Sequence, residues 1–239
     1  MALNDETVEA LVSKYVSNNM VLSFGTSADS IRFVKKLALK IEEEELDVSV
    51  VATSREIAHV LSELGLKTVS INDREIDLSI EFADRVDTAF NYIKRDSSSF
   101  VRDKMVAQSA AELMVMVDEE DYGNALSGWI PFEVCKFGWK RTLLQLENLG
   151  KAKLRERKSR PFKTDTNHYV IDVKVDEIYS LGDLEFQAKD IPGVLETGLF
   201  IGYADRVLVH GKKGMKMLSR LDYSRQDSIE EIRSVSLDI

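Results

Sequence analysis

The chain has 239 residues, of which 44% are hydrophobic and 31% charged, so it can bury a core of ordinary size. Its 12 glycines and 3 prolines are few for this length, which excludes collagen-like and Pro-rich disordered classes. The formal net charge of −9 lacks the positive footprint that phosphate-backbone binding needs, so we expect no nucleic-acid partner.

The single cysteine and the lack of long apolar runs indicate where in the cell the protein works. Cys135 is the only cysteine and cannot form an internal disulfide, which fits a reducing environment. The sequence has no apolar run near the ~20 residues of a membrane span, and residues 1–8 are too polar for a signal peptide. We therefore expect a cytoplasmic protein without a membrane partner.

The first half of the chain alternates two kinds of pattern. Apolar residues at helical spacing predict helices near 5–16 and 31–41, and Thr53 or Ser54 can cap a third helix. Short apolar runs predict strands at 20–24, 48–52, 66–70 and 76–82. Strands that alternate with helices are typical of a parallel sheet wound with helices.

The second half of the chain lacks the regular alternation of predicted strands and helices. After an irregular stretch at 83–99, the patterns predict a helix at 100–111 and a strand at 113–117. Strands then mix with helices without βαβ regularity. The predicted helices are 137–149 and 181–191; the predicted extended segments are 152–157, 168–175, 194–200 and 206–210.

These patterns predict an α/β protein of two parts. Residues 1–128 and 206–218 would form the parallel-sheet domain, with strand 206–210 rejoining the first sheet. Residues 129–205 would form a smaller α+β, ferredoxin-like lobe. Residues 219–239 would be a C-terminal extension, either a short amphipathic helix or disordered.

The first candidate for chemistry is the turn from Gly25 to Ser30, between a predicted strand and a helix. Small residues at a helix N-terminus present backbone N–H groups that can bind an anion. The alternative is a tight turn in which Ser27 or Asp29 caps the helix, and the Asp29 carboxylate would compete with a phosphate for the same amides.

Two further segments carry titratable residues. Glu81 and Asp84 follow a predicted strand and could share proton transfer, or they could lie in a solvated turn with Asp84 paired to Arg85 or Lys94. The segment from Lys94 to Lys104 combines lysine, serines and the helix-borne Asp103. Together these groups could stabilise an oxyanion and supply a base. The alternative is a surface loop whose serines cap the next helix.

Other polar residues point to no site of their own. His59, His168 and His210 show no metal-ligand spacing, so we expect no metal. The basic stretch 155–163 could contact a phosphate or a neighbouring subunit, or it could be a solvated hairpin.

Three segments resemble one family, the A-type ribose-5-phosphate isomerases. Residues 191–205 are similar to the family's "IPGVVETGLF…ADKV", 161–172 to "PFVTDNGNYILD", and 131–141 to "PVEV…FAWRR". The resemblance extends from about residue 12 to 218. It implies an α/β domain with a smaller lobe set between its strands, and subunits assembled as a homodimer or homotetramer.

The resemblance also implies a reaction and its residues. Ribose 5-phosphate and ribulose 5-phosphate would interconvert through an enediol, with no metal and no cofactor and a small sugar phosphate as partner. Asp103 would be the general base, one methylene shorter than the family's glutamate. Lys94, Asp84 and Glu81 would serve the sugar oxygens. The substrate and phosphate positions would be Gly25, Thr26, Ser27, Asp29, Ser30, Arg95, Ser97 and Ser98.

The altered loops leave two alternatives open. Family glycines are replaced at Ser23, Ser27, Phe82, Arg95, Asp96, Ser97 and Ser98. A side chain at such a position restricts close backbone approach and positive φ. The chain could therefore be a paralogue that kept the fold as a binding protein, or an isomerase for a different sugar whose hydroxyls bind Asp29.

Overall fold

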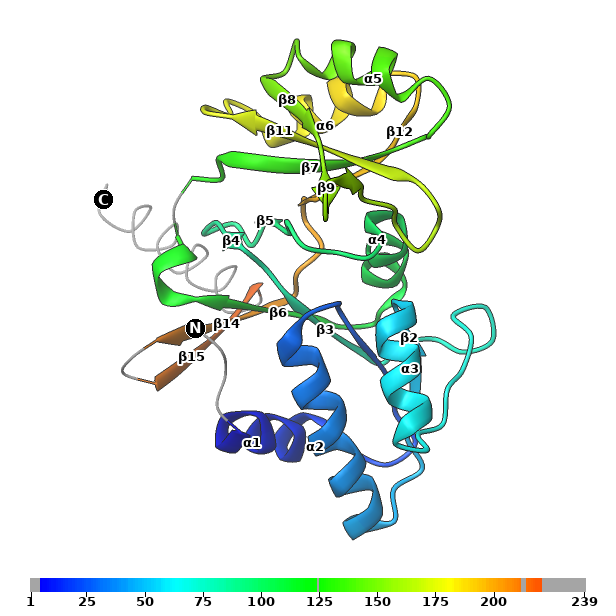
Figure 1. The fold of residues 1–239 in the computed structure, drawn as a ribbon. Coiled ribbons are helices and arrows are strands. Elements are labelled where there is room, and N and C mark those ends of the chain that lie inside the picture. Colours follow the sequence, from blue (N-terminus) through cyan, green and yellow to red (C-terminus); the bar gives the residue numbers. More distant parts are fainter. Residues whose placement is uncertain (1–4, 124, 212–213, 221–239) are drawn as a thin grey trace, which may run out of the picture.

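A computed structural model describes residues 5–123, 125–211 and 214–220 of the chain. Figure 1 shows a sheet wound with helices in its lower half and a lobe of strands and helices above. Within the described ranges, no helix has both the length and the apolar composition needed to cross a membrane. The predicted extension at 219–239 lies outside the described residues, apart from Ser219 and Arg220.

Among the described residues, six strands form the main sheet, in the order β15-β14-β6-β3-β1-β2. All neighbours pair in parallel except β15, which adds to β14 as an antiparallel edge. The predicted parallel sheet is confirmed, including the return of 206–210 to it. The strands are β1 (Val21–Phe24), β2 (Ser49–Ala52), β3 (Leu78–Phe82), β6 (Leu113–Asp118), β14 (Arg206–Gly211) and β15 (Gly214–Ser219).

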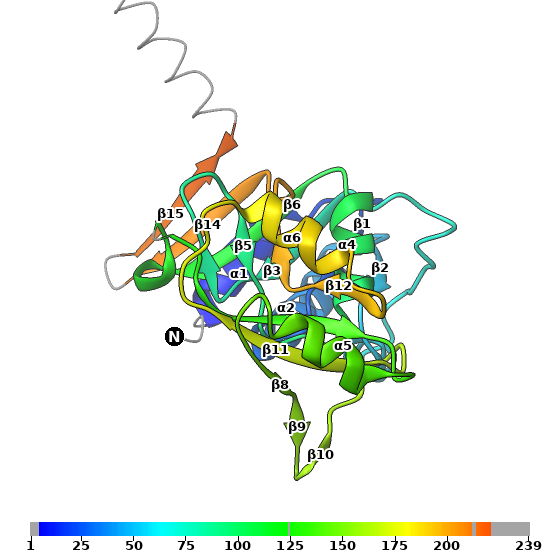
Figure 2. The same ribbon diagram turned by 90° about the horizontal axis from the view of Figure 1, so that it is seen from above.

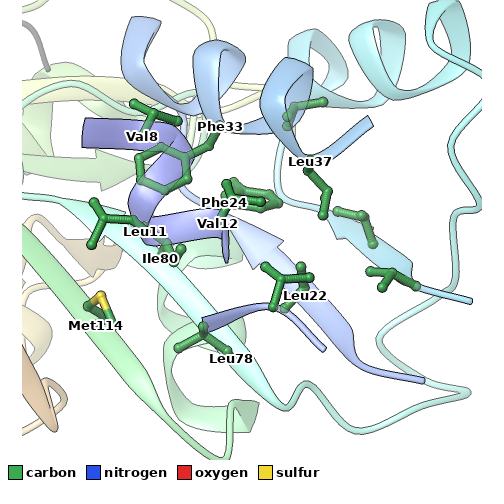
Figure 3. Packing of buried hydrophobic residues seen from close by; sticks show 14 of the residues in the cluster. Val8, Leu11, Val12, Leu22, Phe24, Phe33, Leu37, Leu78, Ile80 and Met114 are labelled. Carbon is green, nitrogen blue, oxygen red and sulfur yellow. The ribbon is translucent and has the colours of Figure 1, made fainter. Parts of the chain in front are cut away.

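Helices cover both faces of this sheet. They are α1 (Asp5–Tyr15), α2 (Ala28–Glu44), α3 (Arg55–Glu63) and α4 (Phe100–Ser109). Because side chains alternate along a strand, Phe24 of β1 packs with Phe33 and Leu37 of α2 (Figure 3), whereas Val21 packs on the opposite face with Val106 of α4. Both faces of the central strands are therefore buried.

Serine side chains begin the helices that follow strands or loops. Ser27, Ser54 and Ser99 precede α2, α3 and α4, and each hydroxyl accepts the backbone N–H three residues on. Ser54, not Thr53, is therefore the cap of α3. Each of these helices thus carries one capping acceptor in its own sequence.

The lobe contains a second sheet, which in the described residues has the order β12-β7-β11-β8 with every pair antiparallel. Its elements follow the chain as β7 (Gly128–Val134), α5 (Trp139–Leu146), β8 (Lys151–Leu154), β11 (Tyr169–Val175), α6 (Leu181–Lys189) and β12 (Val194–Thr197). This βαββαβ succession is the split βαβ arrangement of ferredoxin-like folds, which confirms the predicted α+β lobe. α5 and α6 pack on the same apolar cluster.

Several strands were not predicted. The stretch 83–99, expected to be irregular, contains β4 (Arg85–Val86) and β5 (Tyr92–Ile93), which pair with each other and with β13 (Leu199–Phe200). β7 and β15 were also missed. β4 and β5 have only two residues each and β7 contains Pro131, so they are hard to recognise without their partners.

The predicted strand at 66–70 is wrong. This segment touches the sheet only at its edge, where Lys67 and Val69 exchange backbone hydrogen bonds with Val50 and Thr68 forms an isolated bridge. The basic stretch 155–163 is largely an exposed hairpin of β9 (Glu156–Arg157) and β10 (Arg160–Pro161), which projects from the lobe in Figure 2. This matches the alternative of a solvated hairpin.

Candidate active site

The strand pairing of β1 and β3 brings polar side chains onto one buried face. Ser23 of β1 lies opposite Ser79 of β3, and Glu81 follows two residues later on the same face. All three residues are 0% exposed, in strands whose other face is apolar. Polar residues at these core positions mark the part of the sheet where chemistry can occur.

Gly25 lies next to Glu81 at the carboxyl ends of these strands. Its backbone N–H donates to the carbonyl of Ile80, and a Cβ built at Gly25 would overlap the Glu81 carboxylate. The requirement for glycine is therefore close approach, so that the carboxylate can lie flat against the β1 backbone.

Lys94 follows β5 and joins two carboxylates in the interior. Its Nζ lies 2.5 Å from Oε2 of Glu81 and 2.7 Å from Oδ2 of Asp103. The three side chains are at most 1% exposed. Burial of such charges is tolerated only when they are paired, so each of the three depends on the others.

Asp103 reaches this cluster from the first turn of α4. Its Oδ2 also accepts a 2.6 Å hydrogen bond from the Ser97 hydroxyl, and the Ser97 oxygen in turn accepts the backbone N–H of Ser99. Oε1 of Glu81 and Oδ1 of Asp103 are buried and accept no hydrogen bond within the described residues. Each carboxylate thus has one oxygen without a hydrogen-bond partner among the described residues.

The electrostatics of the cluster favour a carboxyl that can hold a proton near neutrality. Burial raises the pKa of Glu81 to about 7, with the Lys94 ammonium opposing this rise and the Asp103 carboxylate adding to it. Burial also acts to lower the pKa of Lys94, but the charges of Asp103 and Glu81 outweigh it and raise that pKa above its ordinary value. Lys94 is therefore a fixed cation, and Glu81 can exchange a proton.

Asp84 lies at the edge of this cluster. Its Oδ2 accepts the backbone N–H of Arg95 at 2.6 Å, and burial raises its pKa against that hydrogen bond. Lys94 pairs with other carboxylates, and Arg85 contacts Ser127 and Asp121. The alternative in which Asp84 forms an ion pair with Lys94 or Arg85 in a solvated turn is therefore wrong.

The turn at Gly25 to Ser30 matches the capping alternative in one respect. Ser27 caps α2 by accepting the N–H of Ser30, and the Ser30 hydroxyl donates to the Gly25 carbonyl. The Asp29 carboxylate does not cap the helix; it lies 3.7 Å from Arg32, one turn further on. Thr26 Oγ1 is buried and finds no hydrogen-bond partner among the described residues.

The segment after Lys94 divides between two roles. Ser97 belongs to the carboxylate cluster rather than to an open loop, whereas the Ser98 carbonyl accepts the N–H of Asp165 from the lobe. Lys94, Ser97 and Ser99 are each about 1% exposed, so the alternative of a surface loop is wrong, although Ser99 does cap α4.

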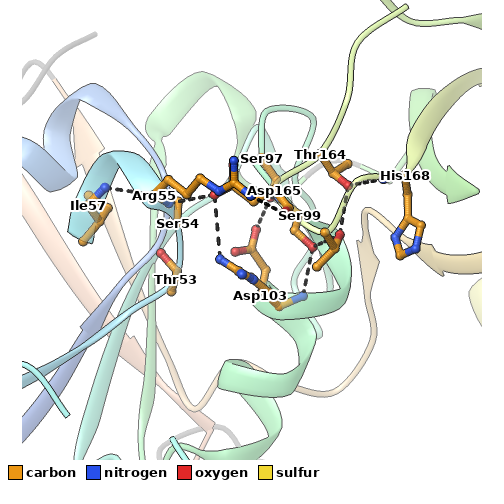
Figure 4. A network of polar contacts seen from close by, with 12 residues as sticks. Thr53, Ser54, Arg55, Ile57, Ser97, Ser99, Asp103, Thr164, Asp165 and His168 are labelled. Atoms are coloured by element: carbon orange, nitrogen blue, oxygen red, sulfur yellow. Dashed lines mark hydrogen bonds and ion pairs between the residues drawn. The ribbon is translucent and has the colours of Figure 1, made fainter. Parts of the chain in front are cut away.

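One buried carboxylate beside the cluster was missed in the sequence. Glu133 of β7 is 0% exposed and accepts hydrogen bonds from α4 and from the lobe segment 164–168. Figure 4 shows Thr164 and His168 beside Ser97, Ser99 and Asp103. The available signal was a charged residue within the apolar run from Ile130 to Val134.

A cavity of about 910 Å³ lies beside the cluster and not at it. It is bounded by β2, the segment 65–71, α3 and the outer side of α4, where Arg102 and Met105 line it. Within the described ranges, no three His, Cys, Asp or Glu residues are grouped to hold a metal ion.

Comparison with known proteins identifies the family. The model of the family "Ribose 5-phosphate isomerase A (phosphoriboisomerase A)" matches residues 49–214. The chain belongs to this family. The match includes Glu81, Lys94 and Asp103.

Individual relatives extend over most of the chain. The ribose-5-phosphate isomerase A of Methanothermobacter thermautotrophicus is 31% identical over 207 residues, which cover 85% of this chain and 92% of the relative. The solved structure of ribose 5-phosphate isomerase A from Methanocaldococcus jannaschii has a TM-score of 0.83 at 31% identity and covers 90% of this chain and 98% of that one.

A second solved structure bears on ligands. It is a D-ribose-5-phosphate isomerase in complex with phospho-erythronic acid, with a TM-score of 0.84 at 30% identity, and it covers 90% of this chain and 97% of that one. The fold of the isomerase family therefore includes both the main sheet and the lobe of this chain.

Proposed function

We propose that this protein interconverts ribose 5-phosphate and ribulose 5-phosphate. The observation that carries the proposal is the buried cluster in which Lys94 lies between the carboxylates of Glu81 and Asp103. Family membership supports the substrate, since the relatives are ribose-5-phosphate isomerases and one of them binds phospho-erythronic acid.

The reaction moves one proton between neighbouring carbons. A carboxylate removes the proton from C2 of the open-chain aldose, the C1 carbonyl becomes the hydroxyl of an enediol, and the proton returns at C1 as the C2 oxygen becomes a carbonyl. Asp103 is the proposed base, because its Oδ1 is free while Oδ2 is held by Lys94 and Ser97.

Lys94, Glu81 and Asp84 are proposed to act on the sugar oxygens, which gain and lose charge and protons during the reaction. Lys94 stabilises the negative charge that develops on the enediolate oxygen. Glu81, with a pKa of about 7, can pass a proton between the two substrate oxygens at neutral pH. Asp84 is proposed to bind a sugar hydroxyl.

The phosphate is proposed to bind at the start of α2. Helix N-termini favour anions, and Thr26, Ser27 and Ser30 lie there. Asp29 is turned toward Arg32, so its carboxylate does not cap the amides. Arg95 and Ser98, which follow Lys94 in the chain, are proposed to add a cation and a hydroxyl. We further propose a cytoplasmic location and a homodimer or homotetramer.

A coupled assay that follows ribulose 5-phosphate formed from ribose 5-phosphate tests the function. We expect turnover by the wild type and a loss of more than about 1,000-fold in Asp103→Asn, because the amide cannot accept the proton. Lys67→Ala, on an exposed ion pair, is the control and keeps full activity.

Failure has two distinguishable forms. A wild type with neither turnover nor a thermal shift in ribose 5-phosphate contradicts the proposal and favours a binding protein that kept the fold. A thermal shift with unphosphorylated sugars alone favours an isomerase for a different sugar.

A further inference from the structure

Glu133 is a buried carboxylate that the proposed chemistry does not use. It lies on β7 of the lobe, with its side chain 0% exposed. An ionised carboxylate in such a position is expensive unless each of its lone pairs is satisfied. The partners that satisfy it connect the lobe to the helix that carries Asp103.

On one side, Glu133 holds the lobe segment 164–168. Its Oε1 accepts the hydroxyls of Thr164 at 2.8 Å and Thr166 at 2.5 Å, and His168 Nδ1 lies at 2.9 Å. The two threonine hydroxyls are 2.9 Å apart, and Thr164 Oγ1 also accepts the backbone N–H of His168. Three side chains of the segment 164–168 therefore contact the same oxygen, Oε1 of Glu133.

On the other side, Glu133 holds the first turn of α4. Its Oε2 accepts the backbone N–H of Val101 at 3.1 Å and the Ser99 hydroxyl at 3.2 Å. The backbone carbonyl of Ser99 accepts the N–H of Asp103 at 3.1 Å. Glu133 thus supplies acceptors for donors at the N-terminus of α4 that the Ser99 cap leaves unpaired.

A continuous path runs from this turn to the reacting cluster. The N–H of Ser99 donates to Ser97 Oγ at 2.9 Å, and Ser97 Oγ donates to Asp103 Oδ2 at 2.6 Å. Oδ2 of Asp103 is the oxygen that contacts Lys94. A shift of Ser99 therefore moves both the backbone and the side-chain partner of Asp103.

We propose that Glu133 is a positioning residue, which sets the place of the Asp103 carboxylate through the first turn of α4 and Ser97. The inference rests on the proposed function, and it adds that the lobe holds the base in register with Lys94. Because a misplacement of about 1 Å can lower a rate about 100-fold, a carboxylate remote from the substrate can control turnover.

Glu133→Gln tests the inference with two measurements. The amide keeps the shape but turns an N–H₂ group toward donors, so the turn loosens. We expect amide hydrogen exchange at Val101 and Asp103 to quicken about 10-fold or more, and kcat for ribose 5-phosphate to fall about 10- to 100-fold with KM changed less than about 3-fold.

Asp172→Asn is the matched control. Asp172 is a buried carboxylate on the neighbouring strand β11, where it pairs with Arg155. Its loss weakens the lobe. Among the described residues, its partner Arg155 meets α4 only through a cation–π contact with the ring of Phe100, and no described hydrogen bond joins Asp172 to α4. We therefore expect kcat and exchange at Val101 and Asp103 to stay close to wild-type values. An equal effect in both variants contradicts the proposal, because a general loosening of the lobe then explains it.

The path through Ser97 has its own test. If Glu133 acts through Ser97, Glu133→Gln combined with Ser97→Ala lowers kcat by less than the product of the single effects. If the double variant lowers kcat by the full product of the two single fold-changes, Glu133 does not act through Ser97. Should Glu133→Gln fail to fold, Thr166→Val removes one hydroxyl donor to Glu133 and should also lower kcat. Thr166→Ser keeps the hydroxyl and should keep the wild-type kcat.

The two readouts separate this inference from the proposed function. A wild type without turnover ends the proposed function, while hydrogen exchange in α4 still decides the positioning role. Wild-type kcat together with wild-type exchange at Val101 and Asp103 in Glu133→Gln overturns the inference and leaves the proposed function intact.

Discussion

Gly25 and Glu81 illustrate how one residue fixes another in the cluster. The turn after β1 requires glycine because the Glu81 carboxylate occupies the space in which a Cβ would lie. This requirement differs from the usual one of positive φ, and a turn pattern in the sequence does not reveal it. The neighbouring strand decides it.

Gly25→Ala is expected to displace the Glu81 carboxylate from the backbone of β1. We expect a loss of about 1–3 kcal/mol in the free energy of unfolding and of about 100-fold in kcat. Urea denaturation and the coupled assay measure the two effects. Gly182→Ala, which meets no atom within 4 Å on helix α6, is the control and should stabilise by up to about 1 kcal/mol. Equal behaviour of the two variants would refute the contact.

The pKa of Glu81 predicts a pH dependence of stability. Burial raises this pKa from 4.5 to about 7, so the folded state disfavours the ionised form. The contribution of Glu81 is therefore fully present below pH 4.5 and is lost as the pH rises through 7, by at most about 3 kcal/mol. Glu81→Gln removes the dependence.

Urea unfolding of the wild type and of Glu81→Gln at several values from pH 4.5 to 8 checks this. The wild type should lose stability relative to the variant across this range. Lys94 stays charged throughout this range because its pKa is raised, so it does not make stability depend on pH. Parallel curves for the two proteins would mean that Glu81 is not perturbed.

Helix α4 is the element that joins the parts of the site. Its first turn carries Asp103, and the next residue, Lys104, points to the lobe. Lys104 is 5% exposed, contacts Glu185 of α6, and lies 2.7 Å from Glu196 of β12. Burial acts to raise the pKa of Glu196, but the Lys104 charge together with hydrogen bonds from Lys104, from a second lysine and from a backbone N–H lowers it overall.

Lys104→Ala should destabilise the protein by about 3 kcal/mol, because it leaves the partly buried carboxylate of Glu196 with less compensation. Lys67→Ala removes a lysine from an exposed pair with Asp47 and should leave stability almost unchanged. Thermal or urea denaturation compares them. A loss of under 1 kcal/mol in Lys104→Ala would show that the pair is not needed to dock α4 on the lobe.

At the scale of the whole molecule, the main sheet and the lobe share several contacts. β13 pairs with β5, the N–H of Lys94 donates to the carbonyl of Gly198, and the N–H of Gly198 donates to the carbonyl of Pro131. The predicted boundary between 205 and 206 separates β13 from the strand β14 that follows it. The division into domains stays a prediction, and these contacts argue for coupled folding.

We therefore expect one cooperative unfolding transition. Both tryptophans of the chain, Trp129 and Trp139, lie in the lobe and report on it by fluorescence, while far-ultraviolet circular dichroism reports on all helices and strands. The two signals should give the same midpoint in urea. Separate midpoints would show that the lobe unfolds independently.

The sequence by itself determined what depends on local pattern. Period and capping residues predicted most helices and several of the longer strands, as in α2 after Ser27 and β6 at 113–118, because these elements carry their own signals. The motifs of the lobe indicated the family. The residues around Lys94 were also chosen from sequence as site candidates, and their catalytic roles stay predictions.

Only the tertiary structure decided what depends on partners distant in sequence. β7 is a strand because β11 and β12 flank it, and 66–70 is none because only the edge of β2 meets it. Glu133 needs donors more than 30 residues away, which no spacing rule can indicate. The pKa of Glu81 likewise arises from burial between strands and helix, a property that the sequence order does not contain.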